Sequence, residues 1–169
     1  MRRVLFAALA VAAACTPAAD GGNAQAPGRA AVSSTLERPA YVVDSAGMLL
    51  AADEHRIAER LRGFERRTGH QFILVTVRTT NGRGIADYTR DLGNRWGIGR
   101  RGHDDGVILL FAMDDRRVRI AVGDGLRQAL PDETAAQIIR MEILPGMSAH
   151  APDAGVKAGV EAILARLQP

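Results

Sequence analysis

Two almost uninterrupted apolar runs place the strongest constraint on how this chain of 169 residues folds. Residues 72–77 read Phe-Ile-Leu-Val-Thr-Val, and residues 107–112 read Val-Ile-Leu-Leu-Phe-Ala. A strand with one wet face alternates apolar and polar side chains, whereas a strand that is covered on both faces is apolar along its whole length. Both runs therefore predict buried strands, in a sheet that other elements cover on each face.

Apolar residues recur at helical spacing around these strands. Ile57, Leu61 and Phe64 stand at i, i+4 and i+7, which predicts an amphipathic helix over about 52–67. Similar patterns predict a second helix over about 85–96 and a last helix over about 154–167.

A further helix is expected to begin at Pro131, because proline is favoured in the first helical turn. Its predicted apolar face consists of Ile138, Ile139, Met141 and Ile143. Pro145-Gly146 is expected to stop or kink this helix.

Val118, Ile120 and Val122 alternate with arginine and alanine after a tight turn at 114–115, which predicts an edge strand with one wet face. The resulting order is helix, strand, helix, strand, strand, helix, helix. This order predicts an α/β fold, a compact sandwich with a small mixed β-sheet flanked by about four helices. About 130 residues, the predicted domain 39–168, suffice for one hydrophobic core.

The first fourteen residues have the pattern of an export signal. Two arginines precede an uncharged run, 4–14, that is shorter than the roughly 20 residues a membrane-spanning helix needs. Cys15 follows at the position where a lipoprotein signal is cut and lipid is attached, although Ala12 stands where a larger aliphatic residue is usual. The alternative is an ordinary export signal, in which Cys15 has no role. Both interpretations place the protein outside the cytoplasm, in the periplasm or cell envelope, and the first anchors it to a membrane.

Residues 15–38 are rich in Ala, Gly, Pro and Ser, so we expect a flexible tether there. The chain's 22 basic residues, 21 of them Arg, nearly balance its 19 acidic residues, which argues against a nucleic-acid partner. With one cysteine, no disulfide can form within a single chain.

Four ordered segments resemble the TPM domain, also called the TPM phosphatase family. They are 41–49 (Tyr-Val-Val-Asp-Ser-Ala-Gly-Met-Leu), 95–110 (with Arg-Trp-Gly-Ile-Gly and His-Asp-Asp-Gly), 116–126 (ending Gly-Asp-Gly-Leu) and 139–145. The resemblance implies an α/β sandwich in an exported setting. For some members it implies calcium binding and acid phosphatase activity, and for others a role in assembling or repairing membrane complexes.

The family often has Ser or Thr ahead of the first helix, where Leu50 or Ala51 stands here. Two positions beside the expected site also depart from the family's pattern. Asp124 stands between two glycines where the family usually has a bulky residue, and Arg127 stands where it often has glutamate. Both changes alter the charge beside the expected site.

The carboxylates of Asp44, Asp104 and Asp105 are candidate ligands for a hard cation, since calcium takes six to eight oxygen ligands. Asp124 is a further candidate ligand. On spacing alone, an Asp-Asp-Gly sequence is more often a turn with solvated charges. The family resemblance shifts the balance towards a metal site, with Ca²⁺ as the implied cofactor.

Phosphoester hydrolysis requires groups that neutralise the transferring phosphoryl group. Asp104 and Asp105 are the predicted catalytic residues, and Arg95, Arg100 and Arg101 are predicted to bind the phosphate oxygens of a small phosphorylated substrate. A solvated charged loop is an equally good interpretation of Arg100 and Arg101.

Two hypotheses follow from these patterns. In the first, the protein is an envelope-tethered, calcium-dependent phosphatase that acts on phosphomonoesters. In the second, it is a non-catalytic binding factor, ordered by calcium, that assembles or repairs membrane-protein complexes. The sequence contains no recognisable nucleophile motif, which favours the second, whereas the aspartates beside several arginines favour the first.

Overall fold

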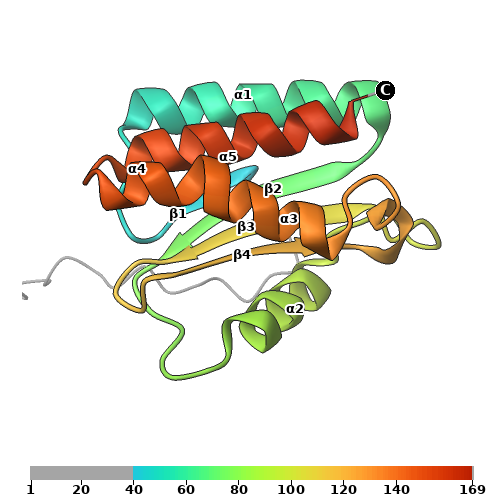
Figure 1. Ribbon diagram of the computed structural model, residues 1–169. Coiled ribbons are helices and arrows are strands. Elements are labelled where there is room, and N and C mark those ends of the chain that lie inside the picture. The colour runs from blue at the N-terminus through green and yellow to red at the C-terminus, as the bar shows by residue number, and fades with distance from the viewer. Residues whose placement is uncertain (1–39, 169) are drawn as a thin grey trace, which may run out of the picture. The chain divides into compact units, whose positions relative to one another are not determined.

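A four-stranded sheet with the strand order β1-β2-β3-β4 runs through the middle of the structure (Figure 1). The computed structural model describes residues 40–168. The first three strands are parallel to one another, and the fourth is antiparallel to the third. The strands are β1 (Val42–Asp44), β2 (Gln71–Val77), β3 (Gly106–Ala112) and β4 (Arg117–Val122). The sheet is therefore mixed, and β4, the strand after the 114–115 turn, lies at its edge, as predicted.

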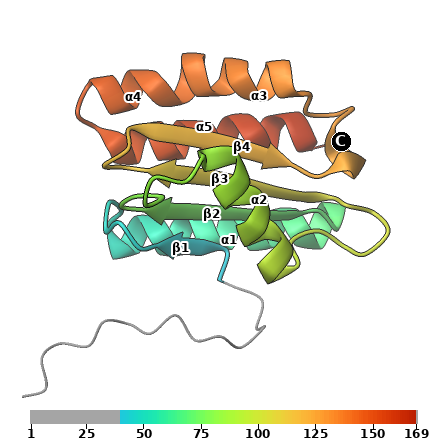
Figure 2. The same ribbon diagram turned by 90° about the horizontal axis from the view of Figure 1, so that it is seen from below.

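Helices cover both faces of this sheet, as the two apolar runs require. Helix α2 (Ile85–Trp96) lies on one face, and α1 (Ala51–Thr68) and α5 (Pro152–Leu167) lie next to each other on the opposite face (Figures 1 and 2). Helices α3 (Asp132–Ile138) and α4 (Leu144–Ser148) lie on the side of α1 and α5 (Figure 1). The predicted α/β sandwich is confirmed.

The side chains of β2 and β3 divide between two apolar cores. One core, under α1 and α5, takes Phe72, Leu74, Val107, Leu109 and Phe111. The other, under α2, takes Ile73, Val75, Ile108 and Leu110 together with Leu92 of the helix. Since burial of one large apolar side chain contributes roughly 1.5–3 kcal/mol, both faces of the sheet hold the fold together.

Strand β1 was not expected from the sequence, whose predicted order of elements begins with the helix over about 52–67. Its three residues pair in parallel with β2, with Val42 opposite Leu74 and Asp44 opposite Thr76. A three-residue strand is too short for an alternating pattern to be visible. It forms because the exposed edge of β2 supplies the hydrogen-bonding partners.

The segment predicted as one helix from Pro131 to Ile143 is built differently. After α3, residues Ile139–Ile143 form a π-helical turn, and α4 follows with Pro145 in its first turn. A π turn holds more residues than an α turn, so it shifts which side chains face inward. Ile143 is fully buried, but Met141 is 64% exposed. The assignment of Met141 to the apolar face was therefore wrong.

The predicted export signal 1–14, the lipidation site Cys15 and the predicted tether 15–38 lie outside the described residues. Within residues 40–168, no helix is both long and apolar enough to cross a membrane.

The π turn can be tested by a pair of substitutions two residues apart. Ile143→Ala should lower the free energy of unfolding by about 3 kcal/mol, because it opens a cavity in the core. Met141→Ala should change it by less than about 0.5 kcal/mol, because the side chain is exposed. Urea denaturation measures both. A large loss at Met141 would contradict the π-helical register.

Candidate functional site

The side chain of Asp105 is the most buried carboxylate at the predicted site, with the residue only 2% exposed. Its Oδ1 accepts a hydrogen bond from the backbone N–H of Arg100 at 2.7 Å. Its Oδ2 accepts one from Arg100 Nε at 2.7 Å, and the guanidinium Nη2 lies 2.5 Å from the same oxygen. His70 Nδ1 lies 3.2 Å from Oδ2. Both oxygens of Asp105 are therefore engaged by protein groups.

These contacts govern the ionisation of Asp105. Burial on its own raises the pKa of a carboxyl group, but the hydrogen bonds from Arg100 and His70 outweigh it and lower the pKa of Asp105 from 3.8 to about 2. Asp105 is thus a carboxylate at neutral pH, which does not suit it to donate a proton as a general acid.

The pairing of β2 with β3 brings His70 to this site. Gln71 lies opposite Gly106, so the residues just before them, His70 and Asp105, are also neighbours. The side-chain oxygen of Gln71 accepts a hydrogen bond from the backbone N–H of Gly99 at 2.8 Å, which holds the other end of the loop. His70 was not among the predicted site residues, because only the register of the two strands reveals its proximity to Asp105.

Asp44 lies at the opposite end of the sheet from Asp105. It pairs with Thr76 of β2, whereas Gly106, next to Asp105, pairs with Gln71. Thr76 follows Gln71 by five residues on the same strand, which at about 3.3 Å per residue separates the two positions by about 16 Å. The structure therefore does not bring Asp44 together with Asp105.

The carboxylate of Asp44 has its own structural role. It accepts hydrogen bonds from the backbone N–H groups of Met48 at 3.2 Å and Leu49 at 2.9 Å, and from the hydroxyl of Thr76. These bonds fix the turn that leads from β1 into α1, a helix whose N-cap, Leu50, makes no side-chain capping bond.

Asp104 and Asp124 are exposed, and they lie near the same end of the sheet as Asp105. The loop 123–125 packs so closely on the backbone of the 103–105 loop that a Cβ on Gly123 would overlap the carbonyl oxygen of Asp104. Asp124 pairs with Arg127, Oδ1 to Nε, at 2.6 Å. The two residues that depart from the family's pattern are thus partners of each other.

The three predicted phosphate-binding arginines have different surroundings. Arg100 is occupied by Asp105, as described above. Arg95 is exposed in the last turn of α2, and Arg101 is exposed in the loop. Of these three arginines, Arg100 is the one whose guanidinium contacts a predicted aspartate within the described residues.

The predicted calcium ligands do not form one cluster. Calcium requires six to eight oxygens around a single point, but Asp44 lies at the far end of the sheet and the oxygens of Asp105 are taken by Arg100 and His70. Among residues 40–168, no three His, Cys, Asp or Glu side chains come together in a group that could hold a metal ion. The arrangement does not fit the predicted four-aspartate site.

A groove that the sequence did not predict lies between α2 and β4 and encloses about 240 Å³. Its lining includes the small residues Gly93, Ala121 and Gly123. Arg90, Arg119 and Arg127 line it from α2, β4 and the loop after β4, and Asp132 is its one acidic residue. We call this the α2–β4 groove.

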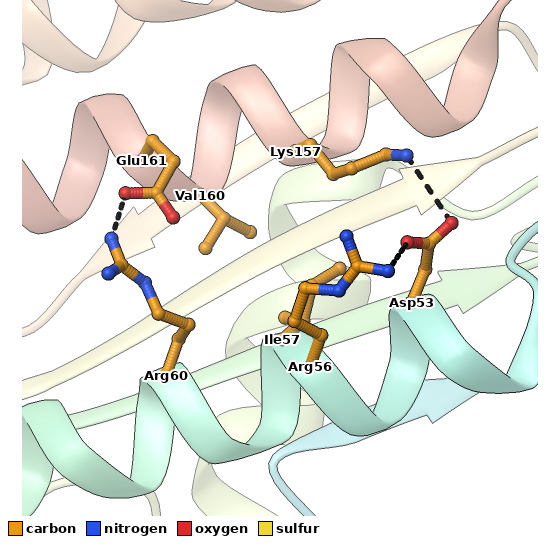
Figure 3. A pocket seen from close by; sticks show the side chains of 7 residues that line it. All are labelled: Asp53, Arg56, Ile57, Arg60, Lys157, Val160 and Glu161. Carbon is orange, nitrogen blue, oxygen red and sulfur yellow. Dashed lines mark hydrogen bonds and ion pairs between the residues drawn. The ribbon is translucent and has the colours of Figure 1, made fainter.

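A second groove, of about 420 Å³, lies between α1 and α5 (Figure 3). Ile57 and Val160 contribute apolar surface, and the charges around them are paired. Asp53 lies 3.3 Å from both Arg56 and Lys157, and Arg60 contacts Glu161. The charged side chains that line this groove are therefore paired with one another across α1 and α5.

The fold, a mixed four-stranded sheet between helices, defines an α/β domain whose aspartate-containing loop anchors the start of β3. The family model of the TPM domain matches residues 42–166, so the chain belongs to the TPM-domain family. This confirms the resemblance seen in the sequence.

Several known proteins are similar to this chain. UPF0603 protein YdjH of Bacillus subtilis (strain 168) is 33% identical over 81 residues, which are 48% of this chain and 30% of that protein. The N-terminal domain of a P. gingivalis protein, solved by NMR, has a TM-score of 0.72 and 31% identity, covering 77% of this chain and 83% of that one. The BA42 protein of Bizionia argentinensis has a TM-score of 0.60 at 18% identity, covering 70% and 81%, and shows the fold alone.

Neighbouring aspartates give a matched test of the anchoring role. Asp105→Asn should lower the free energy of unfolding at pH 7 by about 2 kcal/mol, the stability linked to its lowered pKa. Asp104→Asn should change it by less than about 0.5 kcal/mol, because the residue is exposed and asparagine tolerates its φ of 46°. Thermal and urea denaturation compare the two variants, and equal losses would contradict the account.

Proposed function

We propose that this TPM-domain protein is a non-catalytic binding factor of the cell envelope, which holds or assembles membrane-protein complexes. The observation that carries the proposal is the engagement of the predicted catalytic carboxylate. Both carboxylate oxygens of Asp105 are engaged in hydrogen bonds with Arg100 and His70, so neither is available to activate a water molecule or to hold a cation.

The distribution of charge supports the same conclusion. Asp44, which is half-buried, caps a turn at the opposite end of the sheet from Asp105. Asp124 is neutralised by Arg127. Asp44, Asp105 and Asp124 thus hold their own loops, and of the predicted aspartates only Asp104 is exposed without such a contact in the described residues.

An envelope location and a lipid anchor at Cys15 form part of the proposal. The pattern of residues 1–15 supports them, with two arginines, an apolar run and a cysteine where a lipoprotein signal ends. Such an anchor would keep the domain close to membrane-embedded partners.

Turnover of a generic phosphomonoester tests the proposal against the phosphatase hypothesis. The purified protein is assayed with p-nitrophenyl phosphate across pH 4–8, with and without calcium, and calcium binding is followed in parallel by calorimetry. We expect no turnover above the background without protein, and no saturable calcium binding at the 104–105 loop.

Asp104→Asn serves as the diagnostic variant, because it should keep the fold while removing an exposed predicted catalytic carboxylate. Calcium-dependent turnover that this variant abolishes without a change in melting temperature would overturn the binding proposal. Turnover that it leaves unchanged would point to a contaminating phosphatase, which a mock purification from cells without the gene identifies.

A further inference from the structure

We infer that the α2–β4 groove is a carboxylate-binding site, in which Arg119 receives an acidic side chain of a partner protein. The inference rests on the proposed binding function and names the chemistry by which the partner is recognised.

Arg119 has an unusual environment for an arginine. Its Nε is the one buried side-chain nitrogen or oxygen of residues 40–168 that has no hydrogen-bond partner. A buried donor left unpaired costs free energy, so native structures rarely keep one without a reason. The residue lies in the middle of an edge strand and lines the α2–β4 groove.

The other arginines of the groove are already matched with acids. Arg127 lies 2.6 Å from Asp124 and 3.8 Å from Asp132, and Arg90 contacts Asp87. Arg119 is therefore the arginine of the groove that keeps an unpaired donor, its Nε–H. Because the charges of Arg90 and Arg127 are balanced by these acids, Arg119 supplies the unbalanced positive charge of the groove.

The shape of the available donor favours a carboxylate. The Nε–H and one Nη–H of a guanidinium point in parallel, and they match the two oxygens of a carboxylate as a bidentate pair. The volume of about 240 Å³ is below the roughly 300–1,000 Å³ of most small-molecule sites, so it suits one inserted side chain better than a whole cofactor.

The position of the groove allows a protein segment to approach. β4 is the last strand of the sheet in the described part of the chain, so no further strand blocks its outer side.

A binding titration with matched variants tests the inference. The probe is a fluorescein-labelled octapeptide of alternating glutamate and serine, at low ionic strength, and the same peptide with glutamine in place of glutamate is the control. Arg119→Gln should weaken binding by about tenfold or more, the loss expected for one charge-assisted pair. Arg117→Gln makes the same charge change on the same strand outside the groove, and should weaken binding less than threefold.

Two further measurements separate a binding role from a structural one. Arg119→Gln should leave the melting temperature unchanged or higher, because it removes an unpaired buried donor. In NMR spectra of the wild-type protein, the peptide should shift the amide signals of Gly93, Gly106 and Gly123, which line the groove.

Three results would overturn the groove assignment. They are equal losses of peptide affinity in the two arginine variants, amide signal shifts confined to other surfaces, and equal affinities for the glutamate and glutamine peptides. Displacement of the peptide by inorganic phosphate at concentrations where acetate has no effect would overturn it as well, since the site would then prefer phosphate. If the groove assignment is overturned and no phosphomonoester turnover is found, the proposed binding function still holds. If the protein shows calcium-dependent turnover and also binds the glutamate peptide in the groove, the proposed function is refuted but the groove assignment holds.

Discussion

The ion pair between the buried carboxylate of Asp105 and the partly exposed guanidinium of Arg100 is the contact on which the candidate site depends. It closes the 99–105 loop over the start of β3, and His70 at the start of β2 completes it. Removal of Arg100 would leave the buried charge of Asp105 without compensation. Such a loss lowers the free energy of unfolding more than replacement of both partners by apolar residues does. The loop is therefore held in one conformation, and the glycine loop 123–125 packs directly on it.

The parallel register of the sheet sets the distribution of the remaining carboxylates. Since β1 and β3 run in the same direction, a residue that ends β1 and a residue that precedes β3 must lie at opposite ends. Asp44 and Asp105 occupy these two positions. Each is surrounded by donors from its own neighbourhood, so the aspartates act as two separate structural anchors.

The sequence predicted the fold well and the site only in part. The apolar runs of β2 and β3 and the periodicity of α1 are direct consequences of burial, so they are visible in one chain. β1 is held by pairing to β2 and Met141 is turned outward by a π turn, and neither effect leaves a local pattern. Arg100 and Asp105 were expected at the site, but their mutual neutralisation, the contact of His70 and the unpaired Nε of Arg119 depend on tertiary contacts.

The ionisation of Asp105 tests the account most directly, because an anchoring carboxylate and a metal-binding carboxylate titrate differently. An NMR pH titration that follows its side-chain carboxyl carbon should give a pKa of about 2, below the ordinary 3.8, and the value should not change when calcium is added. The contribution of Asp105 to the free energy of unfolding should then be fully present above pH 3.8 and be lost as the pH falls towards 2. A pKa near 3.8, or a carboxyl signal that shifts on addition of calcium, would contradict the account.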